Sequence, residues 1–95
     1  MNYEEFKTRI LEEVKSHLTG EEQAYYEHAD GNMLKDSLVI QNRDSQMKFG
    51  ATFSSMYEVY NAGLALEEMA ERLVQENREQ KKVKALQRVY MLENY

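Results

Sequence analysis

The stretch FGATFSSMYEVYNAGLALEEMAERLV, residues 49–74, decides the fold. It begins with the alternation of apolar with polar or small side chains that is typical of a strand with one buried face. Ser54 or Ser55 then stands where a short helix needs an N-cap, and Gly63 stands where that helix must end. A second helix follows, and its core face comprises Leu66, Met69, Ala70, Leu73 and Val74. The segment therefore predicts a strand followed by two helices.

An N-terminal helix is predicted over residues 2–18. Asn2 can cap its first turn, Glu5 stands at the capping-box spacing, and Gly20 can stop the helix. The apolar positions fall three or four residues apart, at Tyr3, Phe6, Ile10, Val14 and Leu18. This spacing predicts an amphipathic helix that packs on a core.

Three short segments between the helices favour strands. Residues 21–29 fit either a helical turn or a strand, and the turn signal Asp30-Gly31-Asn32 follows them. A strand core is expected over residues 34–41, a polar turn over residues 42–46, and a strand over residues 47–53. Because the connections are short, we expect an antiparallel meander. The predicted fold class is α+β.

The C-terminal third reads as one long helix, because residues 64–95 contain neither glycine nor proline. Its apolar stripe is interrupted by QENREQKK, residues 75–82, and resumes weakly at Val83, Leu86, Val89 and Tyr90. We interpret this gap as a boundary between a compact domain, residues 1–77, and a basic helical extension, residues 78–95. The extension is expected to project from the domain or to pair with another chain; the two alternatives are that it folds back onto the sheet or that it is a frayed end.

Composition places the chain among small globular domains. It has 95 residues, 42% hydrophobic and 31% charged side chains, a net charge of −5 and no cysteine. One domain is expected, without disulfides or thiolate metal sites. The N-terminus has no basic region followed by an apolar run, and no apolar run approaches the roughly 20 residues of a membrane helix. We expect a cytoplasmic protein that does not contact a membrane.

Charge is distributed unevenly along the chain. Residues 1–71 contain 14 acidic and 6 basic side chains, whereas residues 72–95 contain 3 acidic and 6 basic ones. A basic helix can follow a phosphate backbone, so nucleic-acid binding is an alternative prediction. Its candidate phosphate-contacting residues are Arg78, Lys81, Lys82, Lys84 and Arg88.

The pattern from Tyr57 to Met69, YEVYNAGLALEEM, resembles a family of uncharacterised bacterial proteins, classed only as a domain of unknown function. The opening YEEFK and the strand LVI, residues 38–40, are similar to it too. The resemblance covers about residues 2–76, the N-terminal part of often longer proteins. The chain has Asp30-Gly31-Asn32 where the family usually has an Asn-Asn-Gly turn, and Phe49-Gly50 where it usually has a proline. The resemblance implies an α+β fold and supplies no site.

No arrangement of residues predicts catalysis. His17 and His28, the two histidines, have no carboxylate at a metal-ligand spacing. Neighbouring glutamates on a helix point about 100° apart, and therefore do not converge on one substrate atom. Ser54 and Ser55 have no adjacent histidine or glycine-flanked elbow. The sequence predicts no enzyme, no metal, no cofactor and no small-molecule ligand.

The function expected from the sequence is a non-enzymatic protein–protein interaction domain. The expected partner is either another protein or a second copy of the chain, with which it would form a homodimer. A second hypothesis is an inhibitor of a bacterial defence nuclease, encoded by a phage or mobile element in the manner of anti-CRISPR proteins, because carboxylates can imitate phosphates. The candidate partner-binding residues are Tyr57, Tyr60, Val83, Leu86, Val89 and Tyr90.

Overall fold

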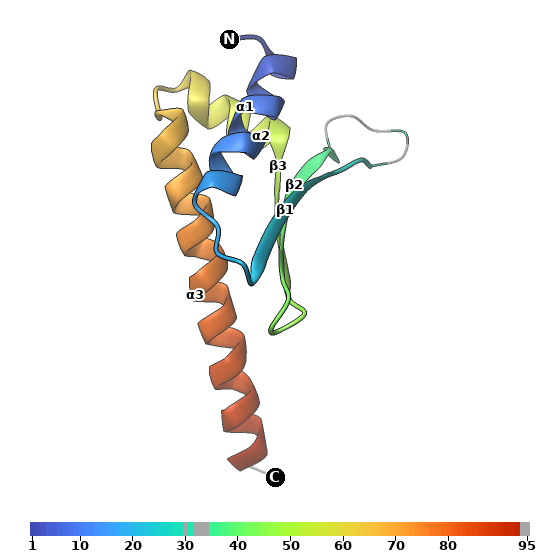
Figure 1. Ribbon diagram of the computed structural model, residues 1–95, viewed down its shortest axis with the longest axis vertical. Helices are drawn as coiled ribbons and strands as arrows, with labels where there is room; N and C mark the ends of the chain where they lie inside the picture. The colour runs from blue at the N-terminus through green and yellow to red at the C-terminus, as the bar shows by residue number, and fades with distance from the viewer. Residues whose placement is uncertain (30, 32–34, 94–95) are drawn as a thin grey trace.

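The computed structural model describes residues 1–29, 31 and 35–93, and it describes side chains as far as Gln87. Its elements follow the order helix, three strands, helix, helix (Figure 1). They are α1 (Tyr3–Ser16), β1 (Glu22–Glu27), β2 (Ser37–Asn42), β3 (Lys48–Thr52), α2 (Phe53–Asn61) and α3 (Leu66–Glu93). The predicted α+β fold class and the order of its elements are confirmed.

The three strands form an antiparallel meander in the order β1-β2-β3. Across the sheet, Ala24 lies opposite Ile40, and Ile40 lies opposite Phe49. The ambiguous residues 21–29 therefore contain a strand, because Glu22–Glu27 pair residue by residue with β2. Side chains on the face that includes Ala24 and Ile40 pack against the helices.

A single apolar cluster joins that sheet face to all three helices. Phe6, Ile10 and Val14 of the N-terminal helix and Met69 of the predicted core face are buried, and so are Leu38, Ile40 and Phe53. Phe49, Leu66 and Leu73, also expected in the core, are half-buried and pack against the cluster. The cluster further contains Ala24, Met56, Ala70 and Val74.

Two predicted helix boundaries were wrong. Helix α1 ends at Ser16 with His17 as its C-cap, so Gly20 does not terminate it. Helix α2 is capped by Thr52, whose Oγ1 accepts a hydrogen bond from the Ser55 backbone N–H at 3.4 Å. The two serines therefore lie inside the first turn. Thr52 is the last extended residue, and an N-cap needs both that backbone conformation and a side-chain oxygen.

The middle of the chain also differs from the prediction. Strand β2 ends with Asn42, which the sequence assigned to a turn, and β3 ends before Phe53. The segment expected to begin a strand at residue 34 falls partly outside the described residues, as do Asp30 and Asn32 of the turn. Phe53 continues the apolar alternation in sequence, but it is the first residue of α2 and fully buried.

Helix α3 is the longest feature of the molecule. Gly63, at φ 115°, separates it from α2, and its N–H donates to the Tyr60 carbonyl. A helix of 28 residues is about 42 Å long, most of the 51 Å longest dimension. Its first half lies beside α1, and its second half extends past the β2–β3 turn (Figure 1).

Candidate interaction surface

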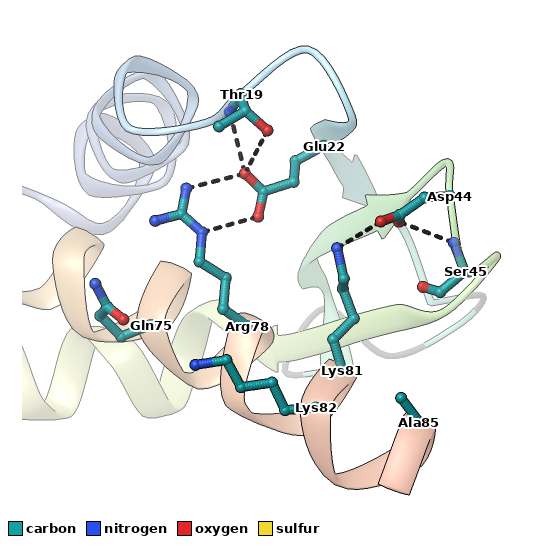
Figure 2. A pocket seen from close by; sticks show the side chains of 9 residues that line it. All are labelled: Thr19, Glu22, Asp44, Ser45, Gln75, Arg78, Lys81, Lys82 and Ala85. Atoms are coloured by element: carbon teal, nitrogen blue, oxygen red, sulfur yellow. Dashed lines mark hydrogen bonds and ion pairs between the residues drawn. The ribbon is translucent and has the colours of Figure 1, made fainter. Parts of the chain in front are cut away.

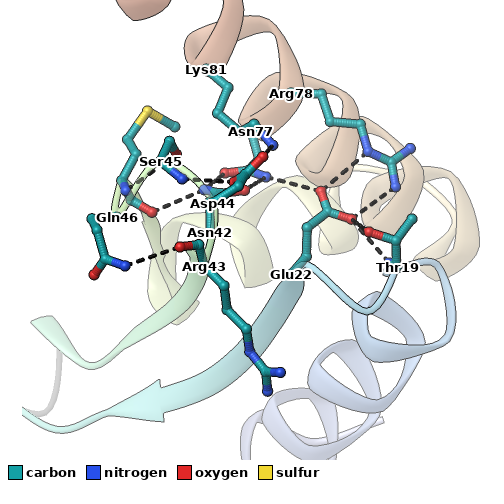
Figure 3. Close-up of polar contacts among 11 residues, drawn as sticks. Thr19, Glu22, Asn42, Arg43, Asp44, Ser45, Gln46, Asn77, Arg78 and Lys81 are labelled. Carbon is teal, nitrogen blue, oxygen red and sulfur yellow. Dashed lines mark hydrogen bonds and ion pairs between the residues drawn. The ribbon is translucent and has the colours of Figure 1, made fainter.

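Two buried asparagines connect α3 to the sheet. Asn42 at the end of β2 and Asn77 in α3 are fully buried. Each donates a side-chain N–H to the other's Oδ1, both at 2.9 Å (Figure 3). Asn42 Nδ2 also donates to the Met47 carbonyl at 2.9 Å. Buried amides require such partners, so the pair fixes the position of α3 along the sheet.

A buried ion pair lies next to these amides. The Glu22 side chain is 3% exposed and accepts from Arg78 Nε at 3.2 Å and from Arg78 Nη2 at 3.0 Å (Figure 2). The Thr19 backbone N–H and hydroxyl donate to it at 3.0 and 3.2 Å, and Asn77 Nδ2 donates at 3.3 Å. We call Glu22, Asn42, Asn77 and Arg78 the α3 anchor.

The environment of Glu22 makes stability depend on pH. Burial raises the pKa of Glu22. The hydrogen bonds and charge of Arg78, together with the hydrogen bonds of Thr19, lower it by more, so the net pKa lies below the ordinary value. Hydrogen bonding to Glu22 correspondingly raises the pKa of Arg78. A carboxyl whose pKa is depressed on folding contributes stability above its unfolded pKa, about 4.3, and loses it as pH falls through the folded pKa.

We therefore expect Glu22→Gln to destabilise the protein most at neutral pH. The difference in unfolding free energy between wild type and variant should shrink as pH falls from about 6 to 3, because the wild-type carboxylate becomes protonated. Urea denaturation at several pH values measures this difference. Glu12→Gln, at an exposed site of α1, controls for the loss of one formal charge. A Glu22→Gln difference that is constant over this range contradicts the assignment.

The predicted gap at residues 75–82 is part of the domain rather than a separation from it. Asn77 is buried, Arg78 pairs with Glu22, and Lys81 Nζ lies 2.9 Å from Asp44 Oδ2. Contacts between α3 and the rest of the chain thus extend to Lys81, four residues past the predicted boundary at residue 77. The gap lacks apolar side chains because the packing there is polar.

These contacts surround an open pocket of about 560 Å³ between α3, the loop before β1 and the β2–β3 turn (Figure 2). Three predicted phosphate-contacting residues line it, but each has a carboxylate neighbour in the chain. Arg78 pairs with Glu22, Lys81 with Asp44, and Lys82 with Glu79 at 3.6 Å. A phosphate would have to displace those carboxylates. Lys84 is exposed, and the Arg88 side chain lies outside the described ones.

A second polar cluster closes the connection between β1 and β2. The Asp36 side chain is 1% exposed, and it accepts from the Tyr26 hydroxyl and from the Ala29 N–H at 3.0 Å; His28 Nδ1 lies 3.0 Å from Asp36 Oδ1. The Tyr26 hydrogen bond holds the pKa of Asp36 below its usual value, and the same bond raises the pKa of Tyr26 to about 12. The Asp36 carbonyl also accepts from the Phe53 N–H. These contacts tie the sheet to the start of α2.

The predicted aromatic partner-binding residues lie at the edge of the core. The Tyr57 and Tyr60 rings lie 5.2 and 5.3 Å from the Phe6 ring, between centroids. The Tyr57 hydroxyl donates to the Met1 carbonyl at 3.0 Å. Both residues are half-buried. Packing of α1 against α2 accounts for their positions.

The predicted apolar residues of the extension are exposed where side chains are described. Every side chain from Lys82 to Gln87 is exposed, with Val83 at 46% and Leu86 at 70%. The other two members of the predicted stripe, Val89 and Tyr90, lie outside the described side chains. Val83 and Leu86 stand three residues apart, and therefore on neighbouring parts of one helix face.

A shallow apolar groove lies between α2 and α3, a site that sequence reasoning missed. Its volume is about 310 Å³, and its apolar lining comes from Phe49, Met56, Val59, Leu64, Met69 and Leu73. Two charged residues of α3, Arg72 and Glu76, also line it. Val59 is 46% exposed. We call this feature the α2–α3 groove. Its residues come from β3, α2, the loop before α3 and α3 itself, so periodicity within one helix could not reveal it.

Comparison with known proteins found no matching family model, curated protein or solved structure. The resemblance of residues 2–76 to a domain of unknown function thus stays a prediction. Among the residues with described positions, no three metal-ligating side chains gather at one point. No helix in the described part of the chain has the length and apolar character needed to cross a membrane.

Proposed function

We propose that this chain is a non-enzymatic protein-interaction domain that binds a protein partner through the distal half of α3, residues 80–93. The exposure of Val83 and Leu86 on a helix that extends beyond the sheet carries the proposal. Single exposed apolar residues are common on protein surfaces. Apolar side chains three residues apart, however, are the anchors that helices use in partner grooves.

The α3 anchor supports this role energetically. Isolated helices of 12–15 residues are marginal in water, and a binding helix that must first fold loses affinity. In this chain the polar contacts of Asn77, Arg78 and Lys81 hold the helix immediately before Val83. The distal half therefore begins from a fixed turn, which lowers the ordering cost of binding.

The described charges favour a protein partner over nucleic acid. Arg78 and Lys81 are paired with carboxylates of the same chain, so the basic run presents fewer free cations than its sequence suggests. Glu22 and Asp36 are likewise saturated by hydrogen bonds from the chain itself, which counts against a catalytic role. An inhibitor of a nuclease would be one form of such an interaction domain.

We expect Leu86→Glu to reduce partner binding at least tenfold without disrupting the fold of the chain. The substitution places a charge in the apolar contact, while the site itself is exposed and tolerates it. The measurement is chemical cross-linking of the tagged chain in extract of its native host. An amine-reactive cross-linker suits this contact because Lys82 and Lys84 lie close to Val83 and Leu86 in the sequence.

Ala85→Glu is the matched control. It adds the same charge to the neighbouring residue, about 100° around the helix, and should keep the cross-linked species. Adducts that form equally with Leu86→Glu and wild type would remove the support for this surface.

A further inference from the structure

Helix α3 is electrically divided at its midpoint. Its proximal half, residues 66–79, contains five glutamates and two arginines, whereas its distal half, residues 80–93, contains four basic residues and one glutamate. The formal charges are therefore −3 and +3 over 14 residues each. A hollow on the proximal half is lined by Glu68, Glu71, Arg72, Gln75, Glu76 and Glu79. Lys81 is paired with Asp44 of its own chain, but Lys82 and Lys84 are exposed, so the distal half stays basic and complements the acidic half of another helix.

One side of α3 carries both the exposed apolar residues and part of the α2–α3 groove. Positions 72, 76, 79, 83 and 86 are separated by four, three, four and three residues, a spacing that keeps them on one side. Arg72 and Glu76 of this set line the groove, and Val83 and Leu86 are exposed. Asn77 and Lys81, which contact the domain, fall on the other side. The polar contacts that hold α3 to the sheet therefore leave this side unoccupied.

We propose that the partner is a second copy of this chain, which pairs its α3 with the first in antiparallel orientation about a two-fold axis. This inference rests on the proposed function and names its partner. The axis passes near residues 79 and 80, the midpoint of α3. Residue 86 of each copy then lies opposite residue 73 of the other, and residue 83 lies opposite residue 76.

In this arrangement the distal half of α3 in each copy contacts the α2–α3 groove and the acidic proximal half of the other copy. Leu86 of one copy enters the α2–α3 groove of the other, beside Leu73 and Val59. Lys82 of one copy approaches the glutamates that line the proximal half of the other. A two-fold axis repeats each contact, as in most homodimers. Parallel pairing would instead place acidic half on acidic half and basic half on basic half, which is repulsive.

Single cysteines test the orientation, because the chain has no cysteine of its own. Val83→Cys and Glu76→Cys stand at exposed positions that the antiparallel dimer brings together. We expect an equimolar mixture to form a mixed disulfide at least tenfold faster than either variant forms a disulfide with itself. A parallel dimer would give the opposite result, in which Val83→Cys cross-links to itself, and would overturn the proposal.

Sedimentation equilibrium of the purified chain tests the association itself. We expect a wild-type dimer, a Kd at least tenfold weaker for Leu86→Glu, and a wild-type Kd for Ala85→Glu. A purified chain that stays monomeric while Leu86-dependent adducts form in extract would overturn the dimer and leave the proposed function standing. A monomer whose adducts do not depend on Leu86 would overturn both.

Discussion

Replacing Phe53 with alanine is expected to lower the free energy of unfolding by about 3–5 kcal/mol. Phe53 is fully buried, and its ring stacks on Tyr26 with 5.5 Å between centroids. It lies where β3 becomes α2, and its N–H donates to the Asp36 carbonyl at 2.9 Å. Truncation removes a large apolar surface and leaves a cavity between sheet and helices. Domains of this size have roughly 5–15 kcal/mol in total, so the variant should be close to unfolding.

Urea denaturation followed by circular dichroism measures this loss. Val59→Ala, in the same helix at a half-exposed position, is the control and should cost less than about 1 kcal/mol. It separates removal of the buried ring from a general effect on α2. A Phe53→Ala loss below about 1 kcal/mol would mean that the ring does not hold the core together.

Asn77→Ala is expected to cost about 2–3 kcal/mol, although the residue is polar and belongs to a strongly charged stretch. The substitution leaves buried Asn42 Oδ1 without its donor and removes one donor from Glu22. Unpaired buried polar groups each cost about 1–3 kcal/mol. An ordinary surface asparagine would cost less than about 0.5 kcal/mol.

A double-mutant cycle isolates the amide pair. Asn42→Ala/Asn77→Ala should cost less than the sum of the two single substitutions, because removing both partners leaves fewer unpaired groups. Gln75→Ala, an exposed neighbour in α3, controls for helix propensity. Strict additivity of the two single effects would show that the side chains do not stabilise each other.

The order of the elements could be predicted because it depends on local patterns. The alternation before Phe53, the spacing of apolar residues in both long helices and the stop at Gly63 are all visible within a few residues. The cap of α2 was mispredicted because Thr52, Ser54 and Ser55 are all suitable side chains in one short run. Only the backbone conformation distinguishes them, and Thr52 alone has the extended one.

Long-range polar pairs could not be predicted from the sequence. Glu22 and Arg78 are 56 residues apart, and Asp44 and Lys81 are 37 apart. In sequence, the two cations belong to a basic run that is typical of a phosphate-binding helix. Asn77 looks like a solvated residue for the same reason. The exposure of Val83 and Leu86, by contrast, could be predicted from the sequence. It depends only on how few apolar residues stand near them in the same helix.

Because α3 is held to the domain only as far as its middle, its two halves unfold in separate cooperative steps. The residues up to Lys81 contact α1 and the rest of the domain, through the buried Asn77 and the more exposed Lys81, so we expect their amide hydrogens to exchange only when the domain itself opens. In a single copy of the chain, the exposed turns that begin at Lys82 have no such contacts among the described side chains, and their opening follows the helix–coil equilibrium of a short peptide. The backbone forms one helix, but its opening belongs to two separate cooperative units that meet at Lys81.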